Sequence, residues 1–428
     1  MKRGYIRGQV GRGTYVCANP GDGDAPLAWR SKLAYGAQAP ADPAVEGLMR
    51  AAARPEIISF AVGAPALDGF PTDLFAALLV GVSQRDPAAV FGHGPTEGQG
   101  ALRQALGARY RVPADQVLIL SGSLQGLDLL AKCLLERGDA VVVDRPGNRS
   151  ALQAFGGAGA RLVGWDLATA DFEELEDIFL RYRPKLLYTN PTYQNPTGAS
   201  LTVSQRRDLL ELAARYRVPI VEDDAYRELG FGGAPPPSLF SLDEHQVVIS
   251  LNTFSKMLAP GLRVGWLAAP RVMVRQLAQV KLRSDLHTAN LIQLALAELV
   301  VSGGLDRHLR WLRAEHRRRL DCMVAALGEL LPPAALSFRR PDGGIFLWCR
   351  LGIGLDTARL LERATGVGVL FAGADMFYAD GSGANELRLC FAAQPPAQIR
   401  SGVQRLGDAI AAELAGPRHS LGDRFPIV

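Results

Sequence analysis

The chain has 428 residues, of which 48% are hydrophobic and 21% charged, so it can bury a large core and its length suggests about two or three domains. The net charge of +4 is small for this length, so the overall electrostatics require neither a nucleic-acid partner nor a membrane partner. The five cysteines lack the spacing of metal ligands, and the sequence has neither a charged, apolar leader nor an apolar run of 18 residues. We therefore expect no metal site and a cytoplasmic protein with reduced thiols.

Residues 1–16 (MKRGYIRGQVGRGTYV) carry four basic residues and no acidic one. Two short alternating runs flank a Gly-Arg-Gly sequence, which predicts a small hairpin. The hairpin resembles the wing of a GntR-type winged-helix domain, the domain that precedes an aminotransferase-like domain in MocR-type regulators. A simple basic tail is the alternative. The DNA-reading helices that come before such a wing are not in this sequence, so we expect a nucleic-acid partner only if a winged-helix domain is encoded upstream.

The rest of the chain is predicted to form an arm followed by two domains. Residues 17–54 are rich in Ala, Pro, Gly and Asp, and residues 17–71 are expected to form an N-terminal arm and part of a small domain. From residue 72 helical and strand patterns alternate, which predicts an α/β fold with a mainly parallel sheet covered on both faces. We expect a large domain over residues 72–298 and a smaller α+β domain over residues 299–428.

The predicted elements follow from the period of the apolar residues. In the large domain, helices are expected at 72–83, 98–110 and 123–137, and strands at 117–120, 140–143, 161–165, 186–189, 219–222, 247–251 and 263–268. A long helical region over residues 271–331 leads to strands near 335–338, 345–350 and 386–392.

The segment of residues 251–266 (LNTFSKMLAPGLRVGW) contains a lysine that follows two hydroxyl residues and precedes an arginine by seven positions. The Lys256 amine becomes a useful nucleophile when a hydrophobic pocket and a nearby cation lower its pKa. Thr253 and Arg263 add donors that suit a phosphate monoester. An imine-forming amine beside part of a phosphate site suggests pyridoxal 5'-phosphate (PLP); an ordinary surface lysine after a buried strand is the alternative.

Residues 121–135 (SGSLQGLDLLAKCLL) follow a predicted strand and begin a helix. The first amides of a helix are free donors, so this turn can bind a phosphate. A serine that only caps the helix is the alternative.

Two more segments, 188–198 (YTNPTYQNPTG) and 221–229 (VEDDAYREL), lie at the carboxyl ends of predicted strands, where α/β proteins bind ligands. Asp223 or Asp224 would need a positive partner to remain ionised beneath a heterocycle, and a protonated pyridine nitrogen supplies one. Asn195 and Tyr226 are neutral donors that suit a phenolate oxygen. Each of these residues can also be an ordinary turn residue that closes a loop.

In residues 385–392 (NELRLCFA), Arg388 interrupts an apolar strand. A buried guanidinium needs an anion, and a substrate carboxylate held by two hydrogen bonds is a natural one. A structural salt bridge is the competing interpretation.

These segments, in order, are SGSLQGLDLLAK, YQNPTG, VEDDAYREL, TFSKMLAPGLRVGW, DGGIFLW and ELRLCFA. Over residues 55–410 the chain resembles the fold-type I PLP-dependent aminotransferases of class I/II, and most of all the subgroup with 2-aminoadipate aminotransferases and the aminotransferase-like domains of MocR regulators. The resemblance implies a homodimer that moves an amino group between an amino acid and a 2-oxo acid through an aldimine on Lys256. It implies an α/β fold of PLP-dependent transferase type I, with a large domain and a smaller α+β domain.

The resemblance also implies roles for individual residues. Lys256 would form the internal aldimine and act as general base and acid, Asp223 would pair with the pyridine nitrogen, and Tyr226 would complete the catalytic group. The remaining implied contacts are the phenolate oxygen with Asn195 and Tyr226, the phosphate with Gly122, Ser123, Leu124, Thr253 and Arg263, and the substrate with Arg388 and Asn195.

Three positions depart from the family pattern. Asn148, after Pro146 and Gly147, replaces the aromatic residue that usually stacks on the cofactor ring. His93 replaces a Tyr that reaches the phosphate across the dimer interface, and it can still donate a hydrogen bond. Leu124 replaces a Gln, which leaves the backbone amides unchanged. Two other functions therefore remain open: a regulator domain that binds PLP and an amine as a sensor, and a different PLP reaction such as decarboxylation, elimination or racemisation.

Overall fold

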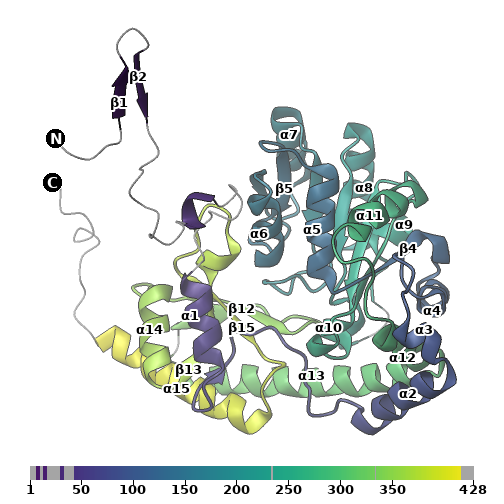
Figure 1. The fold of residues 1–428 in the computed structure, drawn as a ribbon. Coiled ribbons are helices and arrows are strands. Elements are labelled where there is room, and N and C mark those ends of the chain that lie inside the picture. Colours follow the sequence, from purple (N-terminus) through teal and green to yellow (C-terminus); the bar gives the residue numbers. More distant parts are fainter. Residues whose placement is uncertain are drawn as a thin grey trace. The chain divides into compact units, whose positions relative to one another are not determined.

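A computed structural model describes most of the chain (Figure 1). The described residues are 6–9, 13–16, 29–32, 43–232, 235–332 and 334–415. The chain divides into two compact units, residues 1–41 and residues 42–428. Each unit is described by itself.

The first unit contains a two-stranded hairpin and one helical turn. Strands β1 (Ile6–Gln9) and β2 (Gly13–Val16) pair antiparallel, with Ile6 opposite Val16. The turn η1 (Trp29–Lys32) follows. The predicted hairpin is confirmed, while its interpretation as a wing or as a basic tail stays a prediction.

The second unit is built on a seven-stranded sheet with the strand order β4, β10, β9, β8, β7, β5, β6. Its strands are β4 (Val117–Leu120), β5 (Ala140–Asp144), β6 (Arg161–Trp165), β7 (Leu186–Thr189), β8 (Ile220–Asp223), β9 (Val248–Thr253) and β10 (Gly265–Ala268). Strands β5 to β9 pair parallel, and β10 runs antiparallel to both of its neighbours. The predicted α/β fold with a mainly parallel sheet is confirmed.

Helices cover both faces of this sheet, as Figure 1 shows. One face packs on α5 (Ser123–Leu134), α6 (Arg149–Gly157) and α11 (Arg271–Leu282). The other packs on α7 (Phe172–Tyr182), α8 (Val203–Tyr216) and α9 (Leu239–Leu242). Every residue of β4, β7, β8 and β9 is buried, as expected for apolar strands between two helical layers.

Further helices pack beside β4 and β10 at one edge of the sheet. They are α2 (Thr72–Arg85), α3 (Pro87–Phe91), α4 (Gly100–Tyr110) and α12 (Asn290–Val301). The short turn η3 (Ala114–Gln116) connects α4 to β4. The predicted helical region over residues 271–331 divides into α11, α12 and α13 (Gly304–Leu330). The break before α13 is at Gly303, whose φ of +69° suits glycine.

A second, smaller sheet has four antiparallel strands in the order β11, β12, β15, β14. They are β11 (Leu336–Phe338), β12 (Phe346–Leu351), β14 (Ala372–Gly373) and β15 (Glu386–Cys390). The turn η6 (Ala374–Phe377) directly follows β14 in the chain. Strand β13 (Val369–Leu370) pairs parallel with β3 (Ile58–Ser59), so an early segment lies beside a late one.

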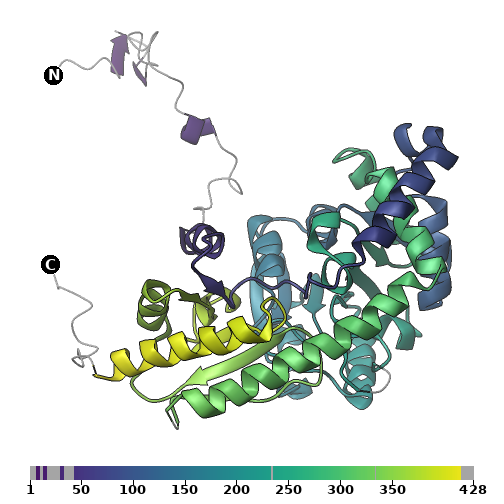
Figure 2. The same ribbon diagram turned by 90° about the horizontal axis from the view of Figure 1, so that it is seen from below.

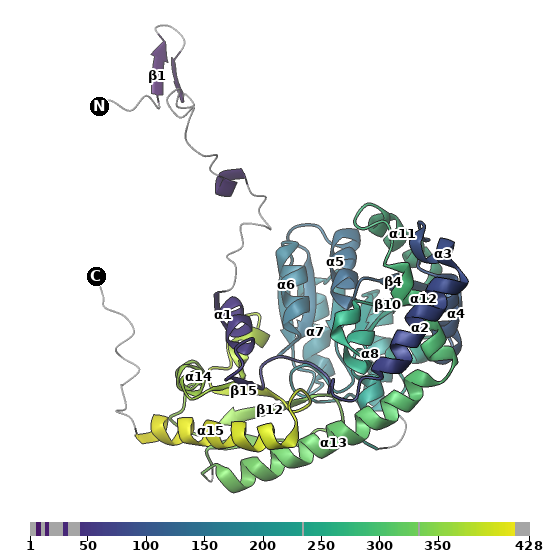
Figure 3. The same ribbon diagram turned by 60° about the horizontal axis from the view of Figure 1, so that its bottom comes forward.

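The small sheet is accompanied by α1 (Pro43–Ala52), α14 (Thr357–Gly366) and α15 (Pro396–Ala415). Helix α13 packs beside α15 (Figure 2), and its other end contacts α12 (Figure 3), so α13 connects the helices beside the two sheets. The domain limits given for residues 17–71, 72–298 and 299–428 stay predictions. Within the described residues, no helix is both long and apolar enough to cross a bilayer.

Candidate active site

The predicted nucleophile Lys256 lies in the short helix α10 (Phe254–Met257), directly after strand β9 in the interior of the sheet. The Thr253 hydroxyl caps this helix by accepting a hydrogen bond from the Ser255 amide at 3.1 Å. The Lys256 amine donates to the Gly63 carbonyl at 2.6 Å. Burial lowers the pKa of Lys256 to about 8, and the nearby Arg388 guanidinium also lowers it. A substantial fraction of this amine is therefore neutral near physiological pH, as a nucleophile or base requires.

Asp223 ends strand β8 and is buried. Its Oδ2 accepts hydrogen bonds from the Tyr188 hydroxyl at 2.6 Å and from the Asn148 amide at 3.2 Å. Its Oδ1 is buried without a partner. Burial raises the pKa of Asp223, and the hydrogen bonds from Tyr188 and Asn148 oppose that rise. A buried carboxylate with one unpartnered oxygen matches a cationic ligand group.

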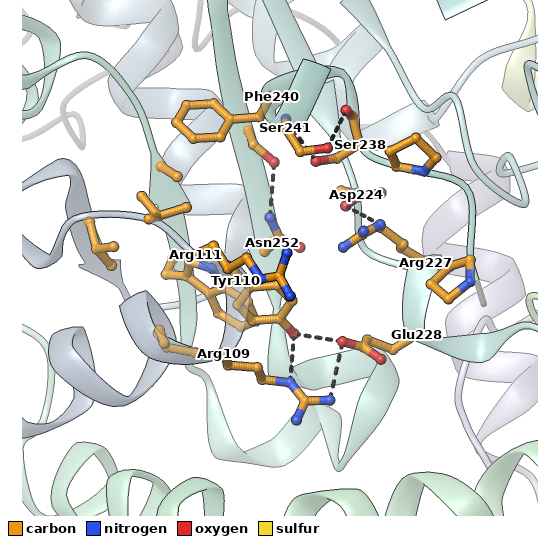
Figure 4. Close-up of a pocket in the computed structure, with 18 residues that line it drawn as sticks. Arg109, Tyr110, Arg111, Asp224, Arg227, Glu228, Ser238, Phe240, Ser241 and Asn252 are labelled. Carbon is orange, nitrogen blue, oxygen red and sulfur yellow. Dashed lines mark hydrogen bonds and ion pairs between the residues drawn. The ribbon is translucent and has the colours of Figure 1, made fainter. Parts of the chain in front are cut away.

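Asp224 lies in a different environment from Asp223. It lines a cavity of about 740 Å³ beside Arg109, Tyr110 and Asn252 (Figure 4). Its Oδ2 is 3.7 Å from Arg227 Nε, where the turn η4 (Arg227–Leu229) begins. Burial raises the pKa of Asp224 well above its ordinary value. Lys256 does not line this cavity, so the structure separates the two neighbouring carboxylates.

Arg388 lies on β15 and joins the small sheet to the strand ends of the large one. Its Nη1 donates to Asn195 Oδ1 at 2.6 Å and its Nη2 donates to the Ala61 carbonyl at 2.6 Å. The guanidinium lies over the rings of Phe346 and Phe377, at 4.0 and 4.7 Å from their centroids.

The Arg388 guanidinium has no acidic partner among the residues that the structure describes. Its Nε is buried without a hydrogen bond, and burial lowers its pKa to about 10. The structural salt bridge that competes with the substrate interpretation is therefore not found in the described part of the chain.

Tyr226 is buried beside Asn195 and its ring packs edge-on against Phe346 at 5.7 Å. Burial raises its pKa above the ordinary value for tyrosine, and a hydrogen bond with Asn195 lowers it in part. The phenol therefore stays protonated and is able to donate.

The predicted phosphate residues meet at the start of α5. Gly122 has a φ of +95°, and no side chain caps the helix that follows. Arg263, which follows the turn η5 (Pro260–Leu262), donates from Nη2 to the Ser121 carbonyl at 3.4 Å. A Cβ atom at Gly122 would lie 2.4 Å from that same Nη2. The first amides of α5 and the Arg263 cation therefore lie beside one another, an arrangement that suits an anion.

His93 is exposed on the loop before α4. Its ring packs edge-on against His287, with 6.1 Å between centroids, and the Asn290 amide donates to the Gly92 carbonyl at 2.9 Å. The structure thus fixes the loop next to α12 without a contact from His93 to Lys256 in the same chain.

The family model of "Aminotransferase class I and II" matches residues 55–406. The chain belongs to the aminotransferase class I and II family. It is therefore a PLP-dependent aminotransferase of fold type I, and neither the sensor function nor another PLP reaction is favoured.

Individual relatives cover nearly the whole of this aminotransferase. It is 36% identical to the 2-aminoadipate transaminase of Thermus thermophilus over 395 residues, which are 91% of this chain and 99% of that protein. A crystal structure of LysN, the α-aminoadipate aminotransferase of Thermus thermophilus, complexed with N-(5'-phosphopyridoxyl)-L-leucine, is 36% identical, has a TM-score of 0.86, and is matched over 91% of this chain and 100% of that one. The helix-turn-helix regulator YdfD of Bacillus subtilis is also similar, at 30% identity over 95% of this chain and 86% of that protein.

Several residues of the aminotransferase site were not predicted from the sequence. Tyr188 belongs to a quoted segment, but only the structure shows that its hydroxyl contacts Asp223. The buried Lys281 amine forms an ion pair with the partly exposed Asp285 at 2.6 Å, and Asp285 in turn accepts from the Ser121 hydroxyl at 3.0 Å beside the predicted phosphate turn. Their spacing of four residues was the one available signal, and it is common on helices.

Proposed function

We propose that this aminotransferase carries out amino-group transfer at Lys256, with the other predicted site residues holding PLP and the substrate. The observation that carries the proposal is the unpartnered Oδ1 of buried Asp223, in the same electrostatic environment as the Lys256 amine. The reaction requires a fixed anion and a base. The Asp223 carboxylate supplies the anion, and the neutral Lys256 amine supplies the base.

The residues present fit the cofactor group by group. Asp223 Oδ1 offers an acceptor for the protonated ring nitrogen, and the Tyr226 hydroxyl and Asn195 amide are donors for the phenolate oxygen. The phosphate would be bound by the amides at the start of α5, from Gly122 to Leu124, and by Arg263. The Thr253 hydroxyl caps α10 here, so its contribution to the phosphate would be in addition to that hydrogen bond.

The chemistry follows from these side chains. When bound, PLP supplies a conjugated ring that accepts the electrons released at the substrate Cα. The neutral Lys256 amine removes the proton from that carbon, because its pKa of about 8 makes it an available base. The Asp223 carboxylate holds the ring-nitrogen proton in place. Arg388 binds the α-carboxylate and orients the Cα–H bond toward the base, with Asn195 as its hydrogen-bond partner.

The substrates are an amino acid and a 2-oxo acid. The relatives named for 2-aminoadipate and for aromatic amino acids support a large substrate side chain, while a similar solved structure is named for alanine and glyoxylate. Arg388 would bind the α-carboxylate, which all amino acids share. It therefore supports an amino-acid substrate without selecting a particular side chain.

We also propose a homodimer in which His93 reaches the partner's phosphate site. The loop of His93 contacts His287 and Asn290, and Asp285 contacts Ser121 and Gln125 at the phosphate turn, so these segments form one continuous surface. That surface carries exposed apolar side chains, with exposed fractions of 75% for Phe91, 52% for Leu124 and 42% for Leu286. A patch of this kind supports an interface.

A cytoplasmic location is part of the proposal. Cys133, Cys322, Cys349 and Cys390 are free thiols, which suits a reducing compartment.

The experiment that tests the proposed function is product analysis with a panel of amino acids and 2-oxoglutarate. We expect glutamate and the matching 2-oxo acid in equal amounts, and we expect Lys256→Ala to form neither above background. Release of carbon dioxide or ammonia in place of glutamate would show a different PLP reaction. A wild-type protein that loads with PLP and yields no product from any pair would support the sensor function.

A further inference from the structure

Asn148 occupies the position where the family usually has an aromatic ring, and its side chain uses its full hydrogen-bonding capacity. Its Nδ2 donates to Tyr188 Oη at 3.1 Å and to Asp223 Oδ2 at 3.2 Å. Its Oδ1 accepts from the Ser150 amide at 3.1 Å and from Asn195 Nδ2 at 3.4 Å. A primary amide has two donor hydrogens and two acceptor lone pairs, and all of them have partners here.

The contacts of Asn148 connect two groups that act on opposite ends of the reacting molecule. On one side is Asp223, and on the other is Asn195, which accepts from Arg388 at 2.6 Å. The backbone beside Asn148 is fixed as well, because the Gly147 amide donates to the Phe377 carbonyl at 2.8 Å. Phe377 is also one of the two rings beneath Arg388.

We propose that Asn148 is a positioning residue that orients the Asp223 carboxylate and the Asn195 amide together, in place of the aromatic ring that it replaces. This inference rests on the proposed function, since it takes Asp223 as the partner of the ring nitrogen. An amide that donates to Oδ2 leaves Oδ1 as the oxygen without a partner. Asn148 and Tyr188 therefore select which oxygen of Asp223 remains available to the cofactor.

The electrostatic environment of Asp223 gives this contact its importance. Among the residues that the structure describes, ionisable groups near Asp223 include Tyr188 on β7, Asp144 on β5, Tyr226 after β8 and Lys256 on α10. Lys256 is the one cation among them, and its own pKa is lowered to about 8. The neutral donors Tyr188 and Asn148, together with the Ala225 backbone, therefore supply much of the stabilisation of the Asp223 charge.

A second role of Asn148 allows a matched set of variants. Its Oδ1 caps helix α6, and Asn, Asp and Ser are about equally good at such a position. Asn148→Asp keeps this acceptor and replaces the donor to Asp223 with a second carboxylate oxygen. Asn148→Ser keeps a capping hydroxyl and has no group that extends to Asp223. If Asn148 only caps α6, both variants should behave like the wild type.

The test uses two measurements on the loaded and unloaded protein, neither of which is turnover. The first is the dissociation constant of PLP, which we expect to rise about tenfold or more in Asn148→Ser because a hydrogen bond to a charged group is lost. The second is the pH titration of the visible absorbance of the bound cofactor. In Asn148→Asp the midpoint of the absorbance change at the acid end of this titration should shift to higher pH by about one unit or more, because two neighbouring carboxylates raise each other's pKa.

The controls separate this inference from the function on which it rests. Melting of the cofactor-free protein checks that Asn148→Asp and Asn148→Ser fold, because each keeps the cap of α6. We expect both to melt cooperatively and below the wild type, because each loses the hydrogen bond from Asn148 to Asp223. Wild-type protein that fails to load PLP on Lys256 would contradict the proposed function. Wild-type protein that loads normally, together with two variants that match it in affinity and in titration, would overturn the role of Asn148 alone.

Discussion

At the scale of single residues, the two neighbouring carboxylates Asp223 and Asp224 are chemically alike and differ only in what surrounds them. Asp223 contacts Tyr188 and Asn148 and keeps one oxygen free, whereas Asp224 lines the separate cavity with Arg227. We predict that Asp223→Asn lowers kcat/KM by about a hundredfold or more, because a neutral amide cannot hold the ring-nitrogen proton.

Asp224→Asn is the matched control, and it should change kcat/KM by less than about fivefold. Asp224 lines the cavity beside Arg227, and Lys256 does not line that cavity, so the substitution leaves the surroundings of the amine unchanged. Steady-state kinetics of the two variants check this prediction. A larger loss in Asp224→Asn than in Asp223→Asn would show that the assignment is reversed.

Lys256 provides a prediction about pH. Its pKa falls from the ordinary 10.5 to about 8, so the reactive neutral amine is the major form above pH 8 and is lost as the pH falls below that value. The rate at which cofactor-free protein captures PLP should therefore rise with pH and reach half its maximum near pH 8. Stopped-flow absorbance between pH 6 and 10 checks this.

The cations near Lys256 offer a control for that pH dependence. Arg388 lowers the pKa of Lys256, so in Arg388→Gln the midpoint of the capture rate should move to higher pH. A wild-type midpoint near 10.5, the ordinary value, would contradict the buried environment of the amine.

At the scale of elements, the start of α5 depends on a backbone conformation that suits glycine. Gly122 and Gly138 have φ values of +95° and +94°, but only Gly122 lies against Arg263. We predict that both Gly122→Ala and Gly138→Ala lower stability by about 1 to 2 kcal/mol from backbone strain. Only Gly122→Ala should also weaken PLP binding, by about tenfold or more, since its methyl group displaces the Arg263 guanidinium.

Thermal melting and cofactor titration of these two variants separate strain from phosphate binding. Equal PLP affinities in Gly122→Ala and Gly138→Ala would argue against a phosphate at the start of α5.

Most strands of the large sheet could be predicted because they are mainly apolar runs that the helices bury on both faces. The limits of β4 and β7 agree with the sequence prediction. The expected strand at 263–268 instead begins at Gly265, because Arg263 adopts a left-handed conformation with a φ of +50°. The expected helix at 123–137 ends at Leu134, where the backbone becomes extended. Such ends depend on local backbone geometry that the apolar period does not record.

The polar residues of the site could be predicted where one short segment contains both a reactive side chain and the strand that positions it, as around Lys256 and Arg388. The contacts between segments could not. No sequence pattern relates Asn148 to Asp223, because the two residues are 75 positions apart in the chain. The sequence likewise does not show that the Lys281–Asp285 ion pair lies beside Ser121, because that contact depends on how distant segments pack.

At the scale of the whole molecule, the proposed dimer predicts which surface controls assembly. Phe91 is 75% exposed on the surface near His93, and Leu180 is 59% exposed on α7, which packs beside β6 at the other edge of the sheet from β4. We expect Phe91→Asp to shift the protein toward monomer in sedimentation velocity, because an interface buries an apolar side chain. Leu180→Asp should leave the wild-type dimer unchanged, and a monomeric wild type would contradict the proposal.

The shared site has its own test in mixed dimers. His93→Ala and Lys256→Ala are each expected to be impaired, and dimers formed from both have one site with both residues intact. Random mixing should restore about one quarter of the wild-type activity, since half of the dimers are hybrids with one working site. Mixed dimers no more active than either parent would show that His93 acts within its own chain or not at all.

The central claim is that Lys256 is the residue that bonds to PLP, and one measurement tests it directly. The protein is incubated with PLP, reduced with borohydride, digested and analysed by mass spectrometry. We predict a visible absorbance band before reduction and, afterwards, one pyridoxyl group per chain on the peptide that contains Lys256. A protein that remains colourless and unlabelled with excess PLP, or one labelled mainly at another lysine, would contradict the account.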